Sequence, residues 1–225
     1  MSATRVYLVR HGATVLTAED RFAGETDVPL SDEGRGQLRK LSERLSGEAV
    51  AAVYASPLGR TMETGKILAG PHGLTVTPMD GLREISHGHW EGRTRAEVEK
   101  EYPAEYARWQ GDPFNFAPPG GETGLSVTAR AIPALLTIVS ANEGKQVIVA
   151  SHKATIRLMI GSLLAFDLRR YRDFLDQSPA SLNILDFKGG AQARLSLFND
   201  TSHYAPTPSG APPIAANRLS GVWGK

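Results

Sequence analysis

A short apolar run near the N-terminus stops abruptly at charged and turn-forming residues. Val6 to Val9 are strand-forming residues, and Arg10-His11-Gly12 follows them directly. Such a run followed by turn residues predicts a buried strand that ends in a turn. In open α/β sheets, ligands bind in the crevice outside the carboxyl ends of the strands. We therefore expect Arg10 and His11 to be held rigidly at one edge of a sheet, as part of a ligand-binding site.

The same pattern recurs along the chain, with helical patterns between the apolar runs. Further strands are predicted over residues 50–55, 74–79, 146–150, 182–187 and 193–198, the last two as a hairpin. Helices are predicted to start at Ser31 and at Ser56-Pro57, and to cover residues 123–141 and 154–165. Pro133 predicts a kink or a break in the third of these helices. The strand–helix alternation predicts an α/β fold, a three-layer α/β/α sandwich around a mostly parallel central sheet.

Domain organisation follows from where the alternation stops. Residues 86–121 are rich in Gly, Pro, Trp and Tyr, with short helical stretches, and we interpret them as a lid insertion. Residues 1–203 are predicted to form one domain. The Pro- and Gly-rich residues 204–225 are predicted to form a poorly ordered tail.

Composition excludes several classes of protein. The 225 residues carry a net charge of only +1, so no global field favours binding to nucleic acid or to a membrane. The chain has no cysteine, which excludes disulfides and cysteine-ligated metals and fits a cytoplasmic protein. The N-terminus lacks the apolar segment of a signal peptide, and we see no apolar run that approaches the length of a membrane span.

Four of the predicted strands are followed by residues that can carry chemistry. Because parallel strands point their carboxyl ends the same way, His11, Arg60, Glu84 and His152 are expected to meet at one edge of the sheet. The two arginines, Arg10 and Arg60, match the oxygens of a phosphate group. A neutral imidazole can attack phosphorus, and a carboxyl group can protonate the departing alkoxide and then activate water.

These residues lie in motifs that resemble those of the histidine phosphatase superfamily, the phosphoglycerate mutase-like proteins. The matching segments keep the order of that family and cover roughly residues 5–200. They are Leu8-Val9-Arg10-His11-Gly12-Ala13-Thr14, Arg21-Phe22-Ala23-Gly24, Asp27-Val28-Pro29-Leu30-Ser31, Ala55-Ser56-Pro57-Leu58-Gly59-Arg60-Thr61, Leu82-Arg83-Glu84-Ile85, Gly88-His89-Trp90-Glu91-Gly92, Gly120-Gly121-Glu122-Thr123 and Ala150-Ser151-His152.

The resemblance implies a role for each central residue. By position, His11 is the nucleophile that becomes phosphohistidine, and Glu84 is the acid and base. Arg10, Arg60 and His152 form the phosphate pocket. No metal and no cofactor are implied, because the cationic side chains take the role of a metal ion.

Two positions depart from the pattern of the family. Thr17 stands where the family often has Asn, and its hydroxyl can still reach a phosphate. Lys153 stands where the family usually has Gly, and its ammonium could meet a second acidic group on the substrate. We count both as candidate substrate-binding residues.

Other candidates carry a competing structural interpretation. Phe22, Trp90 and Arg93 could line the mouth of the site or simply pack under the lid. His203 could approach the substrate or only begin the tail. A His-x-His pair at His87 and His89 could suggest a metal, but packing is favoured because no third ligand is evident.

The function expected from these features is a metal-independent phosphomonoesterase that acts on a small phosphorylated metabolite through a phosphohistidine. The alternative is a phosphoglycerate mutase-type enzyme, and a third class is a non-catalytic phosphate-binding module. The mutases of the family carry a longer insertion after the Glu84 position, so the short segment here favours hydrolysis. Exposed sheet edges permit a homodimer without requiring one.

Overall fold

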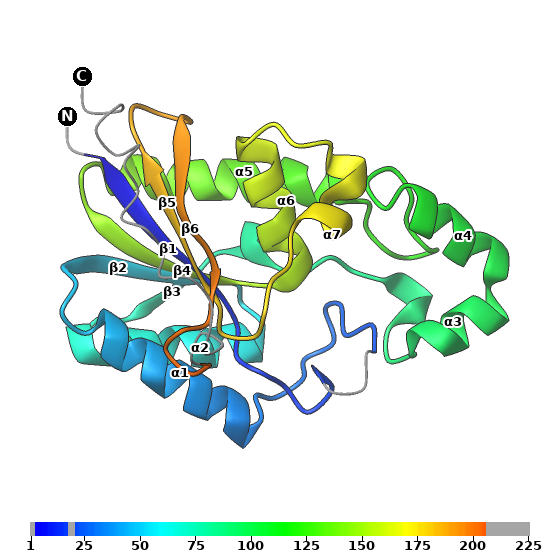
Figure 1. Cartoon of the computed structure of the whole chain (residues 1–225), viewed down its shortest axis with the longest axis horizontal. Coiled ribbons are helices and arrows are strands. Elements are labelled where there is room, and N and C mark those ends of the chain that lie inside the picture. The colour runs from blue at the N-terminus through cyan, green and yellow to red at the C-terminus, as the bar shows by residue number, and fades with distance from the viewer. Residues whose placement is uncertain (1–2, 18–20, 206–225) are drawn as a thin grey trace, which may run out of the picture.

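The apolar run that precedes His11 forms an inner strand of a six-stranded sheet with the order β3-β2-β4-β1-β5-β6 (Figure 1). The computed structural model describes residues 3–17 and 21–205. Its strands are β1 (Thr4–Arg10), β2 (Val50–Ala55), β3 (Val76–Pro78), β4 (Gln146–Ser151), β5 (Leu182–Phe187) and β6 (Ala193–Asp200). Its α-helices are α1 (Asp32–Leu45), α2 (Gly59–Ala69), α3 (Arg95–Glu101), α4 (Pro103–Gly111), α5 (Gly124–Ala141), α6 (Lys153–Leu163) and α7 (Tyr171–Phe174).

The pairing of the strands confirms the mostly parallel sheet. β1 pairs in parallel with β4, β4 with β2, and β2 with β3, whereas β5 is antiparallel to both β1 and β6. Every described strand except β5 therefore runs in the same direction. The carboxyl ends of β1, β2 and β4 lie side by side at one edge of the sheet.

The inner strand is buried on both faces, which gives the three layers. Val6 and Leu8 pack into a core with α5 and α6 on one face. Tyr7 and Val9 pack into a second core with α1 and α2 on the other face (Figure 1). Successive strand residues point to opposite faces, so a continuous apolar run is what a strand between two helical layers requires.

The expected lid lies beyond the carboxyl ends of the strands and carries α3 and α4 (Figure 1). It has an aromatic core of its own, in which Trp90, Tyr106 and Trp109 pack with Phe22 and Val98. This cluster lets the insertion hold its shape beside the sheet edge without extending the main core.

One local prediction is wrong. α2 begins at Gly59, with Leu58 as its N-cap, and not at Ser56-Pro57. The Gly59 amide donates to the Asp27 carboxylate at 3.0 Å. Of the two outcomes predicted for Pro133, a kink or a break, the break is excluded, because α5 continues to Ala141. Pro133 and Ala129 both lie on the exposed face, where the carbonyl that loses its helical partner can be hydrated.

The predicted C-terminal tail covers residues 204–225. The tail begins inside the described residues, but residues 206–225 lie outside them.

By length and composition, α5 meets the requirement of a membrane span, with 18 residues and a mean hydropathy of 1.5, contrary to the expectation of no such run. Its buried residues, among them Ala131, Leu135 and Ile138, pack into the core on the sheet. A core helix of this kind passes the same test, so the length alone is weak support for a span.

Close contact between α1 and the segment after β1 generates a testable prediction. A Cβ at Gly34 would lie 2.1 Å from the Ala13 oxygen, whereas a Cβ at Gly36 on the same helix would meet only the Arg39 side chain at 3.9 Å. We expect Gly34→Ala to lower the free energy of unfolding by about 2 kcal/mol, because the backbone must shift. Gly36→Ala, the matched control, should raise it by roughly 0.5–1 kcal/mol through helix propensity. Urea denaturation measures both, and equal effects would contradict the contact.

Candidate active site

His11 and His152 follow neighbouring parallel strands, and their imidazole rings lie against each other. The ring centroids are 5.2 Å apart, with the rings edge to face. His11 is 7% exposed and His152 is fully buried. Nε2 of His152 lies 2.8 Å from the Ser56 hydroxyl, which follows β2. The structure thus brings the carboxyl ends of β1, β2 and β4 together as the sequence predicts.

The surroundings of His11 leave its ring neutral, with one nitrogen free to react. Nδ1 lies 2.8 Å from the Gly12 carbonyl oxygen. A carbonyl only accepts, so Nδ1 carries the proton and the lone pair of the neutral ring is on Nε2. Burial, then Arg10 and Arg60, lower the pKa of His11 well below its ordinary value of 6.5. At neutral pH the ring is therefore unprotonated, and it lines a cavity.

Arg10 and Arg60 are held by carbonyl oxygens. Arg10 donates from Nη1 to the Gln177 oxygen at 2.6 Å. Arg60 is 2% exposed and donates to the oxygens of Gly24 and Thr26, each at 2.7 Å. Carbonyls satisfy donors without neutralising their charge, so both guanidinium groups keep their positive charge directed at the site. Burial lowers the pKa of Arg10 to about 10, which leaves it charged at neutral pH.

Glu84 reaches the same place from the segment after β3. Its Oε1 accepts hydrogen bonds from the amides of Ile85 at 3.0 Å and Thr155 at 3.2 Å. Its Oε2 accepts from the Ala154 amide at 3.3 Å. Two of these donors belong to the first turn of α6, so backbone amides fix the orientation of the carboxyl group. The carboxyl group lines the cavity and is 9% exposed.

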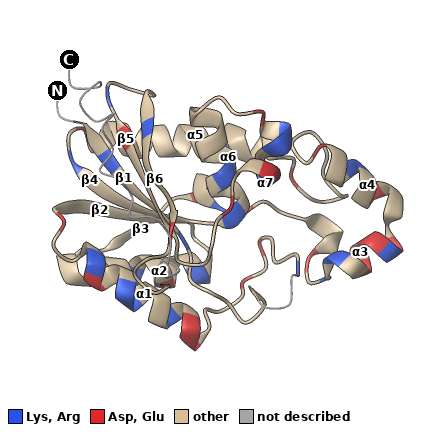
Figure 2. Cartoon of the chain, viewed as in Figure 1, with Lys and Arg blue, Asp and Glu red and all other residues tan. Residues whose placement is uncertain are grey.

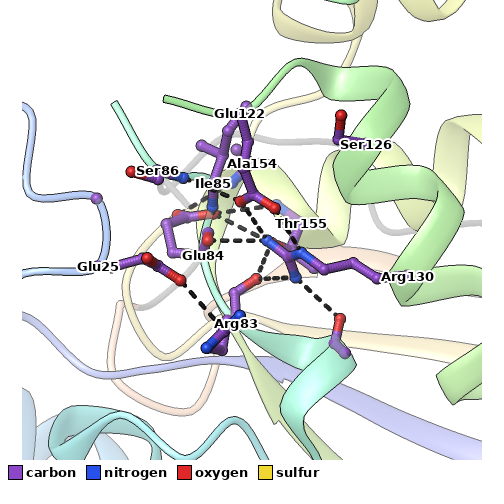
Figure 3. A network of polar contacts seen from close by, with 12 residues as sticks. Glu25, Arg83, Glu84, Ile85, Ser86, Glu122, Ser126, Arg130, Ala154 and Thr155 are labelled. Atoms are coloured by element: carbon purple, nitrogen blue, oxygen red, sulfur yellow. Dashed lines mark hydrogen bonds and ion pairs between the residues drawn. The ribbon is translucent and has the colours of Figure 1, made fainter. Parts of the chain in front are cut away.

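Arg130 of α5 clamps the backbone on both sides of Glu84 (Figure 3). Its guanidinium donates to the oxygens of Gly81 at 3.0 Å, Arg83 at 2.8 Å and Glu84 at 2.9 Å. The same group forms a two-pronged ion pair with Glu122, at 2.9 and 2.8 Å. One side chain thus fixes the segment that carries Glu84 by a planar fork that lysine cannot reproduce. Arg130 is a positioning residue, and sequence reasoning did not identify it.

Glu91, in the lid motif, is the acid that follows Glu84 in the sequence, and its carboxylate binds backbone amides. Its carboxylate accepts from the amides of Glu25, Thr26 and His87, each at 3.1 Å. These bonds tie the loop that Arg60 holds to the lid. Glu91 is not among the residues that line the cavity, whereas Glu84 is.

The cavity beside His11 has a volume of about 360 Å³, a size suited to a small molecule. Three of the predicted substrate-binding residues line it, namely Thr17, Phe22 and Lys153. Thr17 accepts from the Thr14 amide at 2.8 Å, which orients its hydroxyl.

Three other predicted substrate-binding residues do not line the cavity. Trp90 is fully buried in the aromatic core of the lid. Arg93 pairs with Glu101 and lies over the ring of Tyr102 at 5.3 Å. His203 lies against Tyr204 at the end of the described chain, with a ring separation of 4.9 Å. In each case a packing or ion-pair partner takes the side chain away from the cavity.

Several residues that line the cavity were missed from the sequence. The most informative are His87, Arg95, Trp109, Arg157 and Arg172. A signal was available for Arg157, because it lies one helical turn after Lys153 and so shares its face of α6. Arg172 comes from residues 166–181, where we predicted no element. Its position depends on contacts that no local pattern encodes.

The His-x-His pair does not form a metal site in this fold. His87 faces the cavity and packs against Phe22, at 4.7 Å between ring centroids, whereas His89 packs against Tyr102 at 4.6 Å. Within residues 3–17 and 21–205, no three His, Cys, Asp or Glu side chains are grouped to hold a metal ion.

Buried neutral histidines make stability depend on pH. Burial lowers the pKa of His87 to about 4 and holds that of His152 well below 6.5. At pH values between the folded-state pKa of each ring and 6.5, the unfolded chain binds more protons than the folded chain. The free energy of unfolding is therefore full above pH 6.5 and decreases as the pH falls. We expect the free energy of unfolding to drop by at least about 2 kcal/mol between about pH 7.5 and pH 5.

Urea denaturation at the two pH values measures this loss. His87→Gln, which cannot titrate, should show a smaller loss than the wild type. A wild-type stability that is equal at both pH values would contradict neutral burial of these rings.

Comparison with known proteins identifies relatives along most of the chain. The profile of the histidine phosphatase superfamily (branch 1) matches residues 6–201. Phosphoserine phosphatase 1 of Hydrogenobacter thermophilus is 34% identical over 170 residues, which are 76% of this chain and 81% of that protein. Bifunctional protein Rv2228c of Mycobacterium tuberculosis is 34% identical over 204 residues. Those residues are 89% of this chain but only 55% of that longer relative.

The solved structures agree with the sequence comparison. Bacillus stearothermophilus YhfR has a TM-score of 0.84 and 31% sequence identity, and the match covers 89% of this chain and 99% of that one. The expected α/β fold is confirmed by this likeness. With the profile match over nearly the whole described chain, the suspected resemblance is also confirmed, and the chain belongs to the histidine phosphatase superfamily.

Proposed function

We propose that this protein is a metal-independent phosphomonoesterase that hydrolyses a small phosphorylated metabolite through a phosphohistidine on His11. The observation that carries the proposal is the state of His11. Its ring is buried and neutral, its Nδ1 proton is held by the Gly12 oxygen, and two guanidinium groups lower its pKa. An unprotonated Nε2 beside unneutralised positive charge is what nucleophilic attack on a phosphate monoester needs.

In the first step, Nε2 of His11 attacks phosphorus in line with the ester oxygen. The N–P bond forms as the P–O bond to the alcohol breaks, and the carboxyl group of Glu84 gives its proton to the departing oxygen. In the second step, the Glu84 carboxylate takes a proton from water as that water attacks phosphorus. The N–P bond breaks, inorganic phosphate leaves, and both residues return to their starting states.

Positive charge at the site supports these steps by balancing the charge on the phosphoryl oxygens. Arg10 and Arg60 supply two fixed cations. Both arginines line the cavity, whereas His152 packs against His11 and is not among the lining residues. Fixed positive charge beside the phosphoryl oxygens stabilises the charge that develops in the transition state.

The alternative is a mutase, which would return the phosphoryl group to a second hydroxyl instead of to water. Two features support hydrolysis. The segment between Glu84 and Gly121 is short for the mutases of the family, and a phosphoserine phosphatase is among the relatives. The same relative supports a small phosphorylated metabolite as the substrate class.

Removal of the nucleophile tests the mechanism. We expect His11→Ala to lower kcat on p-nitrophenyl phosphate by a factor on the order of 10⁴ or more, because the covalent route is lost. Acid-labile, base-stable ³²P should label the wild type but not this variant. EDTA should leave the wild-type rate unchanged, and His72→Ala, in the turn after α2, should behave as the wild type.

Three results would contradict the mechanism: full labelling of His11→Ala, loss of activity with EDTA, or release of no phosphate. Isomerisation of 3-phosphoglycerate without release of phosphate would establish the mutase instead.

The role of Arg130 can be separated from simple stabilisation. We expect Arg130→Lys to lower kcat on an alkyl phosphate roughly 10–100-fold with KM changed by less than about threefold, because Glu84 loses its fixed position. On p-nitrophenyl phosphate, whose leaving group needs no proton, the loss in kcat/KM, which reports only the transfer to His11, should be much smaller than on the alkyl phosphate. Arg35→Met removes a partly exposed ion pair with Glu63 and is the control. An equal loss in kcat/KM on both substrates would show that Arg130 does not support the acid role of Glu84.

A further inference from the structure

The cavity holds more positive charge than one phosphoryl group requires. Among the described residues, seven cationic side chains line it against two carboxylates, while the whole chain has a net charge of only +1. Arg10 and Arg60 match the phosphoryl group, and Arg21 pairs with Glu97 at 3.5 Å. Four cations remain that the reaction at His11 does not use, and these are Arg95, Lys153, Arg157 and Arg172.

Two of them, Lys153 and Arg157, form the wall that α6 contributes. They lie one helical turn apart, where like charges disfavour each other. They share a single carboxylate oxygen, Oδ1 of Asp176, at 3.9 Å from Lys153 and 2.9 Å from Arg157. That oxygen also accepts from the Gln177 amide at 2.7 Å. One acid thus serves two cations, and the longer contact leaves the Lys153 ammonium the more weakly neutralised of the two.

Lys153 and Arg157 are also close to the phosphoryl side of the cavity. Burial, then Arg157 and Arg10, lower the pKa of Lys153. Arg157 likewise lowers the pKa of Arg10. Positive groups packed this closely raise the energy of the site, and a bound anion between them would relieve it.

The lid and α7, which lies beside α6, add two guanidinium groups to the same cavity. Arg172 stacks on Trp109, with Cζ 3.7 Å from the ring centroid, and Arg95 lies 5.6 Å from the same ring. Arg172 also donates to the Trp109 oxygen at 3.1 Å, which fixes the guanidinium against the lid. Figure 2 shows Lys and Arg positions on α6, next to α7, and on α3. The cations therefore come from separate elements and converge on one cavity.

The size of the cavity limits what can carry the matching negative charge. About 360 Å³ accommodates a small molecule, and the phosphoryl group occupies the part beside His11. Electrostatic complementarity then requires a second anion on the alcohol portion of the same molecule. With a neutral alcohol, the single Asp176 carboxylate would remain shared between Lys153 and Arg157.

We propose that Lys153 and Arg157, with Arg95 and Arg172 lining the same cavity, form a second anion subsite, and that the substrate carries a carboxylate or second phosphate group besides the phosphoryl group that is removed. This inference rests on the proposed function, which it deepens by naming the substrate class. Arg157 is held by Asp176, so Lys153 is the residue whose substitution tests the subsite with the least disturbance. Its side chain is 41% exposed, so we expect its substitution to disturb folding little.

The test uses pairs of esters that differ only in the second anion. One pair is 3-phosphoglycerate and glycerol 3-phosphate, and the other is fructose 1,6-bisphosphate and fructose 6-phosphate. We expect the wild type to prefer the doubly anionic member of at least one pair by about tenfold or more in kcat/KM. The preferred pair identifies the second anion as a carboxylate or a phosphate.

Lys153→Met should lower that preference about tenfold, mainly through KM, and Lys153→Glu should lower it further. Lys66→Met, on the exposed surface of α2, should leave it unchanged. A wild-type ratio near one in both pairs, or a ratio that neither Lys153 variant changes, would overturn the subsite.

A binding measurement keeps this result separate from the proposed function. Calorimetry with His11→Ala gives the dissociation constants of both members of each pair without turnover. Tighter binding of the doubly anionic member that is lost when Lys153 is replaced supports the subsite, even if no ester is hydrolysed. Absence of hydrolysis would overturn only the proposed phosphatase activity. Equal binding of both members with active hydrolysis of p-nitrophenyl phosphate would overturn the subsite alone.

Discussion

Two guanidinium groups are buried at one sheet edge with carbonyl oxygens as their direct hydrogen-bond partners. Arg10 is held by Gln177, and Arg60 by Gly24 and Thr26. A carboxylate in those places would have cancelled the charge, whereas a carbonyl fixes the side chain and leaves the charge in place. Burying such charge costs stability, so the surrounding loops must be held firmly by other contacts. The rest of the site is built around that requirement.

Each loop at the edge is fastened by a polar side chain from another element. Glu91 accepts hydrogen bonds from three backbone amides, two in the loop that Arg60 binds and one in the lid. Arg130 clamps the backbone beside Glu84, and buried Asn183 donates to the Leu8 oxygen and to the Gln177 side chain. These bonds satisfy backbone groups that would otherwise be exposed or unpaired, since loops lack a ladder of their own. The rigidity that the reacting groups need thus comes from side chains outside the cavity.

Much of this arrangement could be predicted from the sequence because it depends on local patterns. Apolar runs that end in turn residues predicted the strands, and parallel pairing then placed His11, Glu84 and His152 at one edge. The start of α2 was placed too early because Ser56-Pro57 is a strong local signal for a helix start. In the fold, the Ser56 hydroxyl contacts His152, which is distant in sequence.

What the sequence did not reveal depends on contacts between distant segments. Arg130 lies inside an apolar helix pattern, in which a single charged residue is predicted to face solvent. In the structure it donates to backbone oxygens of residues 81–84. Arg172 and Asp176 belong to a stretch without periodicity, whose conformation depends on Gln177 and its bond to Arg10. For Trp90 the sequence left two alternatives, the substrate mouth or packing under the lid, and the structure places it in the aromatic cluster of the lid.

The two parts of the cavity differ in how freely they can change. Around His11, the reacting groups are bound to backbone atoms of the strands and loops, so a substitution there disturbs the edge of the sheet. The outer walls are formed by side chains of α3, α6 and α7, and backbone hydrogen bonds within those helices do not depend on Lys153 or Arg95. A different alcohol portion can therefore be accommodated by exchanging outer side chains while the phosphoryl site stays intact. The same separation explains why the family motifs define the reaction here but leave the substrate to residues outside them.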